Sequence, residues 1–234
     1  MEGMFNLFVN LLAAHLVGDF IFQSDKTCLD KREKRGHSFH LYVHSLIIGL
    51  LTWCALGYVR LYWLALIVAL VHLLIDWVKS HSKDCLNAFL YDQLAHLVIL
   101  IAISWIGVKF CGWMQPRSYI CFQDLQMWCI AFIICGKQAN VLIKKVLEAY
   151  KISTKSKRTQ LQFKAGGLIG TLERWLILVF ICLDQYEAIG FLIAAKSIIR
   201  YRDTETDRTE YVLAGTLISV SISVACGVLV KLLN

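Results

Sequence analysis

The sequence predicts an all-α protein, a polytopic integral membrane helical bundle of about seven or eight spans. Hydrophobic residues make up 58% of the 234 residues and charged residues only 18%, with a mean hydropathy of +0.59. Soluble domains carry about 45–50% apolar and about 25% charged residues, so this composition is typical of a chain surrounded by lipid. Apolar segments close to the ~20 residues that a bilayer core requires recur along the chain. The same composition excludes a disordered chain, which needs low hydrophobicity and high charge.

Short polar loops separate the apolar segments. The first segment is preceded by no basic start with a small-residue cleavage site, so we expect it to be retained as a membrane helix. The predicted spans lie near residues 4–23, 41–58, 61–79, 88–110, 125–147, 166–183 and 211–231, with a shorter segment at 186–200. The shorter segment is either a re-entrant or buried helix, or the eighth span.

These spans predict two helical units within one continuous membrane domain. Residues 1–110 form an antiparallel four-helix unit, 111–124 an external connection, and 125–234 the second unit. Basic residues gather in alternate loops, so the positive-inside rule puts the loops 24–40 and 148–165 in the cytoplasm and, with eight spans, both termini outside. We expect a multi-pass protein of the bacterial inner (cytoplasmic) membrane in contact with lipid. The loops account for the net charge of +7, so no nucleic-acid partner is expected, and homo-oligomer formation is left open.

Histidine and aspartate recur at helical spacing within the first four predicted spans. The first, third and fourth spans each hold a His and an Asp four residues apart, which is about one helical turn, and the second opens with histidines. Ionisable groups in hydrocarbon are costly unless they pair, face water or bind an ion, so the set is a candidate site. Its members are His15, Asp19, His44, His72, Asp76, Asp92 and His96. We interpret His37, His40 and His81 as loop or interface histidines.

In the predicted orientation all members of this set lie at a similar depth near the cytoplasmic face. An antiparallel four-helix arrangement lets them converge, as facing side chains do in helix bundles that hold metals. Imidazole and carboxylate are ligands of zinc, and also of iron or manganese, and no candidate is a thiolate. We expect a divalent metal, zinc first. Catalytic roles are expected for Asp19, Asp76, Asp92 and, in the second half, Glu173; Gln23, Lys79 and Gln93 are expected to orient ligands or contact an anionic substrate.

Two other interpretations of the same residues stay open. Buried His and Asp pairs can be hydrogen-bonded links between membrane helices. Chains of Asp and His also form proton or cation relays in transporters. The nine cysteines form no CxxC pair and lie mostly in apolar runs, so we interpret them as small hydrophobic residues.

The second half carries its own ionisable residues. Glu173 and Arg174 fall within a predicted span, Lys196 and Arg200 end the 186–200 segment, and Glu210 opens the last span. All are expected on the cytoplasmic side, so they could form one ion network. One interpretation is a salt-bridge lock between helices, and the other is a phosphate or carboxylate clamp that faces the metal site.

Several of these motifs together resemble the bacterial membrane family known as domain of unknown function 3307. The motifs are His15-x3-Asp19-Phe-x2-Gln23, His44-Ser, His72-x2-Ile-Asp76-x2-Lys79 and Asp92-Gln93-x2-His96, followed by the motifs that end in Glu173-Arg174, Lys196-Ser-x2-Arg200 and Gly215-Thr. The His/Asp core is also similar, more loosely, to predicted membrane-bound metal-dependent hydrolases. The resemblance implies metal-dependent hydrolysis and a soluble cytoplasmic regulatory partner of the SatD type.

The first functional hypothesis is therefore a metal-dependent hydrolase that acts near the cytoplasmic leaflet on a lipid-like or phosphorylated substrate. The alternatives are a proton or divalent-metal transporter or channel, and a membrane signalling or scaffold protein with a structural metal. Transporters often repeat their binding motifs in two halves. The second half of this sequence has no counterpart of the His/Asp motifs, which disfavours transport.

Overall fold

The protein is described here by a computed structural model that covers residues 2–113, 123–150, 160–200 and 206–233. Helices and short turns make up all of these residues, which confirms the predicted all-α class. The chain divides into two compact units, Met1–Ile130 and Ala131–Asn234. Most of the predicted connection 111–124, and much of the predicted loop 148–165, lie outside the described residues.

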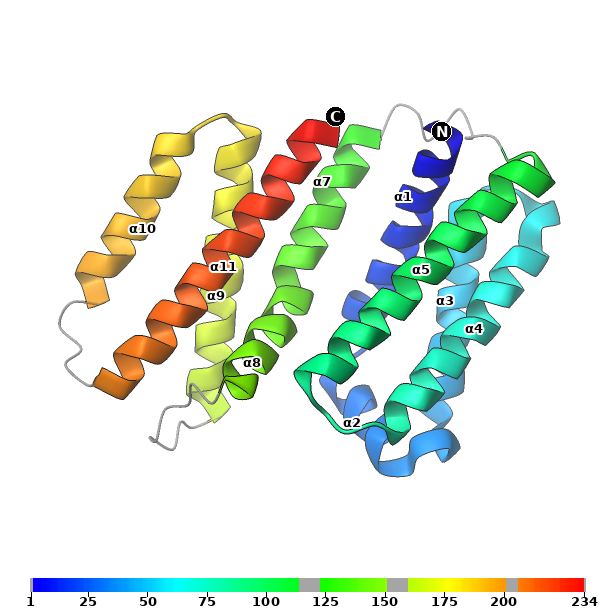
Figure 1. The fold of residues 1–234 in the computed structure, drawn as a ribbon, viewed down its shortest axis with the longest axis horizontal. Helices are drawn as coiled ribbons and strands as arrows, with labels where there is room; N and C mark the ends of the chain where they lie inside the picture. The colour runs from blue at the N-terminus through cyan, green and yellow to red at the C-terminus, as the bar shows by residue number, and fades with distance from the viewer. Residues whose placement is uncertain (1, 114–122, 151–159, 201–205, 234) are drawn as a thin grey trace. The chain divides into compact units, whose positions relative to one another are not determined.

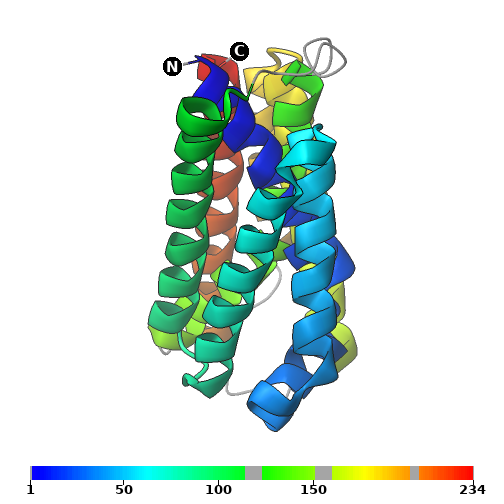
Figure 2. The ribbon, with the colours of Figure 1, turned by 90° about the vertical axis from the view of Figure 1, so that its right-hand side faces the viewer.

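Four long helices run side by side and antiparallel in the first unit (Figures 1 and 2). They are α1 (Glu2–Leu16) with its π-helical continuation η1 (Val17–Phe22), α3 (Phe39–Leu56), α4 (Tyr62–His81) and α5 (Leu86–Cys111). Helix α1 packs on α3 and α5, and α4 packs on the same two helices, so the four close into a ring around one interior.

All four helices are long and apolar enough to cross a membrane, as is the segment Val212–Leu233 of the second unit. Large apolar side chains such as Leu46, Leu70 and Val98 are more than half exposed on the outside of the bundle. Buried polar side chains face its interior instead. Apolar outside and polar inside is the arrangement expected of helices in lipid, and the chain is consistent with a membrane protein. The predicted count of seven or eight spans stays a prediction.

Small residues let α3 and α4 approach closely. A Cβ added to Gly49 of α3 would lie 2.9 Å from the Cβ of Ala69 in α4, which is too close for either helix to stay in place. Small residues at helix interfaces are a common means of packing membrane helices, because van der Waals contact replaces the hydrophobic effect there. The pairing of α3 with α4 therefore depends on this glycine.

We expect Gly49→Ala to lower the free energy of unfolding by about 1–3 kcal/mol, because the added methyl group overpacks the contact with α4. A matched control is Gly190→Ala, where the added Cβ meets no atom within 4 Å. That control is expected to be neutral or to stabilise by up to about 1 kcal/mol, since alanine favours the helical conformation. Unfolding in one detergent measures both variants, and a Gly49→Ala protein as stable as the control would contradict the close packing.

A short helix, α2 (Asp25–Lys34), occupies the segment predicted as the basic loop 24–40. The side chain of Ser24 accepts a hydrogen bond from the backbone N–H of Thr27 and so caps the helix. Asp25 opens the first turn and basic residues fill the last turn, as the helix dipole favours. The turn after α2 packs on α4, since a Cβ on Gly36 would lie 2.5 Å from the indole nitrogen of Trp77. The helix lies at the end of the bundle away from the N-terminus (Figure 1).

The second unit contains α8 (Ala139–Ala149), α9 (Gln160–Cys182), α10 (Tyr186–Arg200) and α11 (Thr206–Leu233), and the boundary between the units falls within α7 (Gln123–Ile133). Helix α11 packs on α8 and α9. A π-helical turn, η4 (Ile134–Gln138), joins α7 to α8 along the predicted span 125–147. The backbone of Gly136 is not helical there (φ −84°, ψ −119°), so this span is kinked.

Candidate metal centre

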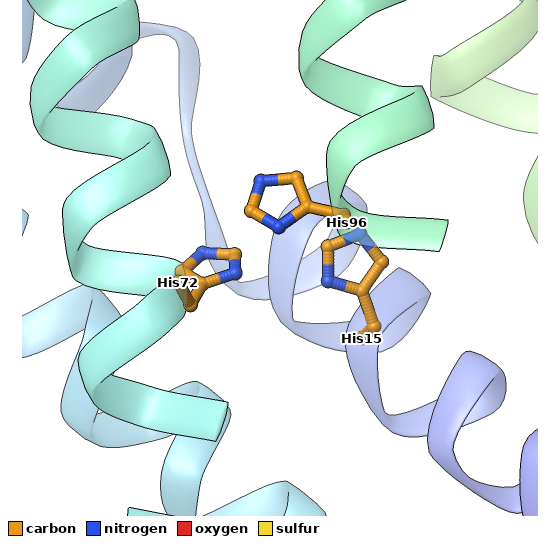
Figure 3. A group of neighbouring side chains, drawn as sticks. All are labelled: His15, His72 and His96. Atoms are coloured by element: carbon orange, nitrogen blue, oxygen red, sulfur yellow. The ribbon is translucent and has the colours of Figure 1, made fainter. Parts of the chain in front are cut away.

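The seven predicted His and Asp residues meet inside the first unit, near the end at which α2 lies. Each is at most 7% exposed. They come from every long helix of the bundle: His15 from α1, Asp19 from η1, His44 from α3, His72 and Asp76 from α4, and Asp92 and His96 from α5. Three of the imidazole rings converge from three different helices in Figure 3. Helical spacing in the sequence thus located residues that the fold brings to one place.

Asp19, His44 and His72 form a compact triangle of potential ligand atoms. The Nε2 atom of His44 lies 3.1 Å from Oδ1 of Asp19 and 3.0 Å from Nε2 of His72. The third side, from His72 Nε2 to Asp19 Oδ1, is 3.6 Å. Tetrahedral zinc with bonds of about 2.0–2.1 Å sets its ligand atoms roughly 3.3 Å apart. The triangle therefore has the dimensions of three ligands on one metal.

Asp76, Asp92 and His96 form a second group whose ligand atoms lie within 4.8 Å of one another. His96 Nε2 is 3.5 Å from Oδ1 of Asp92 and 4.0 Å from Oδ1 of Asp76. Within the described part of the chain, neither Asp92 Oδ1 nor His96 Nε2 has a hydrogen-bond partner, although both are buried. Buried polar atoms are nearly always satisfied, so these two atoms, 3.5 Å apart without a hydrogen bond, are candidates to share a ligand.

His15 lies between the two groups. Its Nε2 is 3.6 Å from Oδ2 of Asp19, and its ring centroid is 4.7 Å from that of His96. A third set of potential ligand atoms, from His15, His72 and His96, again fits within 4.8 Å. All seven donors are imidazole nitrogens or carboxylate oxygens. The residues therefore fit one or two divalent ions of the zinc, iron or manganese type.

Asp92 is oriented by two of the predicted outer residues. Lys79 and Gln93 both donate hydrogen bonds to its Oδ2, the latter over 3.1 Å. This leaves Oδ1 directed at His96. Outer partners that fix a carboxylate in this way are typical of metal sites. Gln23 follows the end of η1 in an extended conformation, so the four-residue spacing of the first span does not continue to it.

Lys31 is a site residue that sequence analysis missed. It is the one buried residue of α2, and its ammonium group donates to Oδ2 of Asp76 over 2.6 Å. Both side chains are at most 8% exposed. In the sequence Lys31 is one of several cations in a charged run, and nothing in that run distinguishes it from its neighbours.

The π-helical turn η1 places Asp19 beside α3. A Cβ on Gly18 would lie 2.2 Å from Cδ1 of Ile48, so the glycine lets the turn approach α3 closely and brings Asp19 to His44. π-Helical turns inside helices occur frequently at functional sites.

The ionisable residues of the second unit divide into two groups. Glu173 pairs with Lys196 between α9 and α10. Arg174 is buried and donates to the carbonyl oxygens of Cys135 and Gly136 at the kink, and to Asn140, Thr171 and Ser219. We therefore interpret Arg174 as a structural residue that satisfies the carbonyl groups freed by the kink. The side chains of Arg200 and Glu210 lie outside the described residues.

The three remaining histidines, which were predicted to be loop or interface residues, are exposed: His37 lies in the short turn after α2, His40 in the first turn of α3 and His81 at the end of α4. The eight described cysteines form no disulfide, and none belongs to the candidate centre.

Fold and site together define a class of protein, a helical bundle with helices able to cross a membrane and a buried His/Asp cluster. Residues 7–120 match the family described as "Protein of unknown function (DUF3307)". The matched segment contains all seven His and Asp residues, which confirms the family resemblance for the His/Asp core. The motifs of the second half lie outside it. No curated protein and no solved structure matches the chain at a significant level.

Proposed function

We propose that the protein is an integral membrane metal-dependent hydrolase of the bacterial inner membrane, acting near the cytoplasmic leaflet on a lipid-like, phosphorylated substrate. The observation that carries the proposal is a pair of buried atoms, Asp92 Oδ1 and His96 Nε2, which lie 3.5 Å apart without a hydrogen bond in the described part of the chain and belong to a cluster of seven potential ligands. A set of links between helices would be expected to satisfy its own polar atoms. Zinc is the first candidate metal.

The orientation follows from the basic residues around the site. Helix α2 carries Lys31, Arg32 and Lys34, and Arg32 pairs with Asp84 in the turn between α4 and α5. These cations lie at the same end of the first unit as the candidate centre. The positive-inside rule assigns that end to the cytoplasm and the N-terminus to the outside. The C-terminus is proposed to lie outside as well, on the prediction of eight spans.

A divalent metal supplies a water of lowered pKa and polarises a phosphoryl or acyl oxygen. The side chains of the bundle exclude bulk water from this centre, since each potential ligand is at most 7% exposed. With a metal held by Asp76, Asp92 and His96, Asp19 is the proposed general base for the attacking water. Lys79 is half-buried beside Asp92, where its charge would offset the negative charge that develops on a phosphate.

One observation favours a second candidate, proton or divalent-cation transport. Asp19, His44 and His72 are joined by consecutive contacts of 3.1 and 3.0 Å, which is a suitable relay for a proton. The relay is separate from Asp92 Oδ1 and His96 Nε2, so it does not explain this pair of atoms. A third candidate, a signalling or scaffold protein with a purely structural metal and a SatD-type partner, predicts bound metal without turnover.

The test is turnover by the purified protein in detergent micelles. Protein stripped with a chelator and reloaded with Zn²⁺, Mn²⁺ or Fe²⁺ is assayed for release of phosphate or fatty acid from phosphorylated and acylated lipids. We expect activity only after reloading, and a loss of about 100-fold or more in Asp92→Asn, since even outer-shell changes cost about 10–100-fold. His37→Gln, at an exposed histidine, is the matched control. The transport function would replace the hydrolase proposal if two results are found together. These are no turnover in micelles, and a proton or cation flux in liposomes that Asp92→Asn abolishes.

A further inference from the structure

A cavity of about 680 Å³ lies between the last turns of α4 and the first turns of α5, beside the candidate metal centre. This volume is in the range typical of small-molecule sites. Its apolar lining includes Leu74, Val78 and Tyr91, which are 61%, 58% and 71% exposed. Because these exposed residues lie on helices long and apolar enough to cross a membrane, we expect the cavity to open toward lipid.

The polar lining of the cavity is concentrated toward one end. Lys79, Ser82 and Lys83 follow the apolar residues of α4 along the chain, close to the end of that helix. The apolar part thus lies deeper in the membrane, and the cations lie at the level of the α4–α5 turn. An apolar cavity with a cationic end is complementary to an amphiphile with a hydrocarbon chain and an anionic head.

The cavity and the candidate centre share a wall. Asp92 is one of the residues that line the cavity, and its Oδ1 lies 3.5 Å from His96 Nε2. Lys79 also lines the cavity while it donates to Asp92. An ammonium group has three donors, and the structure records one hydrogen bond for Lys79, to Asp92. The remaining donor capacity of this ammonium group can serve an anion held in the cavity.

We propose that this cavity binds an anionic phospholipid that enters sideways from the cytoplasmic leaflet. Its chain packs on Leu74, Val78 and Tyr91, and its phosphate lies at Lys79 and Lys83, next to the metal ligand Asp92. The proposal rests on the proposed function and deepens it, since it names the substrate class and the route by which the substrate reaches the centre. A choline headgroup would bring a third cation toward the two lysines, so a zwitterionic lipid is disfavoured.

Photocrosslinking tests this proposal at two neighbouring exposed positions of α5. Tyr91 lines the cavity, and Leu94, which is 55% exposed, does not. Each is replaced in turn by p-benzoylphenylalanine in the full-length protein. The protein is illuminated in uncharged detergent doped with phosphatidic acid or with phosphatidylcholine of the same chains. Mass spectrometry identifies the adducts, and elemental analysis of the same samples gives the metal content.

At position 91 we expect about ten times more adduct with phosphatidic acid than with phosphatidylcholine. The phosphatidic acid adduct at position 91 should also exceed the one at position 94 by about tenfold. A tenfold difference corresponds to one good charge-assisted contact. Lys79→Gln or Lys83→Gln should reduce the phosphatidic acid adduct at position 91, and Ala95→Trp, which fills the cavity, should abolish it. Equal adducts at 91 and 94, equal adducts of the two lipids, or an adduct to another part of the chain would overturn the proposal. If the protein binds metal but fails the crosslinking test, the lipid site is rejected and the proposed hydrolase function is retained. If the adduct is selective but the protein binds no metal, the hydrolase function is rejected and the lipid site is retained.

Discussion

Asp76→Asn is expected to lower the free energy of unfolding of the first unit by about 3–5 kcal/mol, the usual cost of removing one partner of a buried ion pair. The substitution keeps the shape of the side chain but leaves the ammonium group of Lys31 buried without an anion. Both side chains are at most 8% exposed, and 2.6 Å separates Lys31 Nζ from Asp76 Oδ2. The same change removes a proposed metal ligand, so metal content should fall with stability.

A double variant separates these two effects. Lys31→Met replaces the cation with an apolar side chain of similar length, so Asp76→Asn combined with Lys31→Met should regain much of the lost stability. Metal content should stay low in the double variant, because the carboxylate is still absent. Unfolding in detergent and elemental analysis measure the two properties on the same preparations. A double variant no more stable than Asp76→Asn alone would contradict the ion pair, and one that regains metal would contradict a ligand role for Asp76.

Arg174→Leu is expected to destabilise the second unit by about 3–5 kcal/mol, because it removes several hydrogen bonds of a charged donor, each worth about 1.5–3 kcal/mol but not additive. The guanidinium group donates to two backbone carbonyl groups at the Gly136 kink and to three side chains from α8, α9 and α11. Leucine removes all of these donors at once, while the Gly136 carbonyl group and Thr171 keep another one, from the backbone of Ala139 and from Asn140. Hydrogen exchange across 131–234 should then rise toward that of an unfolded segment.

Two further variants sharpen this prediction. Arg174→Lys keeps the charge, but one ammonium group cannot reach all the acceptors. The stability of the second unit in this variant should therefore lie between those of the wild type and Arg174→Leu. Glu173→Gln is the matched control, since its partly exposed pair with Lys196 is worth about 1 kcal/mol or less. Hydrogen exchange unchanged in Arg174→Leu would show that the guanidinium group does not hold the kink.

Much of the fold and of the candidate centre could be predicted from the sequence for one physical reason. Helical geometry places residues four apart on one face, and hydrophobic length locates the helices on which those faces lie. His72 and Asp76 are an example. They lie four residues apart in one hydrophobic segment, so helical geometry alone places both on the buried face of α4. The segment 186–200 likewise coincides with α10.

Other features depend on tertiary contacts that local patterns do not encode. Lys31 is buried because α2 lies at the end of the bundle. The charged residues around Lys31 in the sequence give no sign of this burial. The turn η1 and the kink at Gly136 replace regular hydrogen bonding, so a strict helical period does not extend through either. Arg174 was considered for an anion clamp, yet its donors are directed at the kink, a site that the sequence does not reveal.

Elemental analysis of the purified protein most directly tests the central claim that the His/Asp cluster holds a metal. Wild type is compared with His37→Gln and with the double variant Asp92→Asn/His96→Ala, all purified without chelator and exposed to the same metals. We expect roughly one or two equivalents of zinc, iron or manganese in the wild type and in His37→Gln, and a loss of most of it in the double variant. A wild type with no more metal than the double variant would contradict the claim and make the cluster a proton relay or a link between helices.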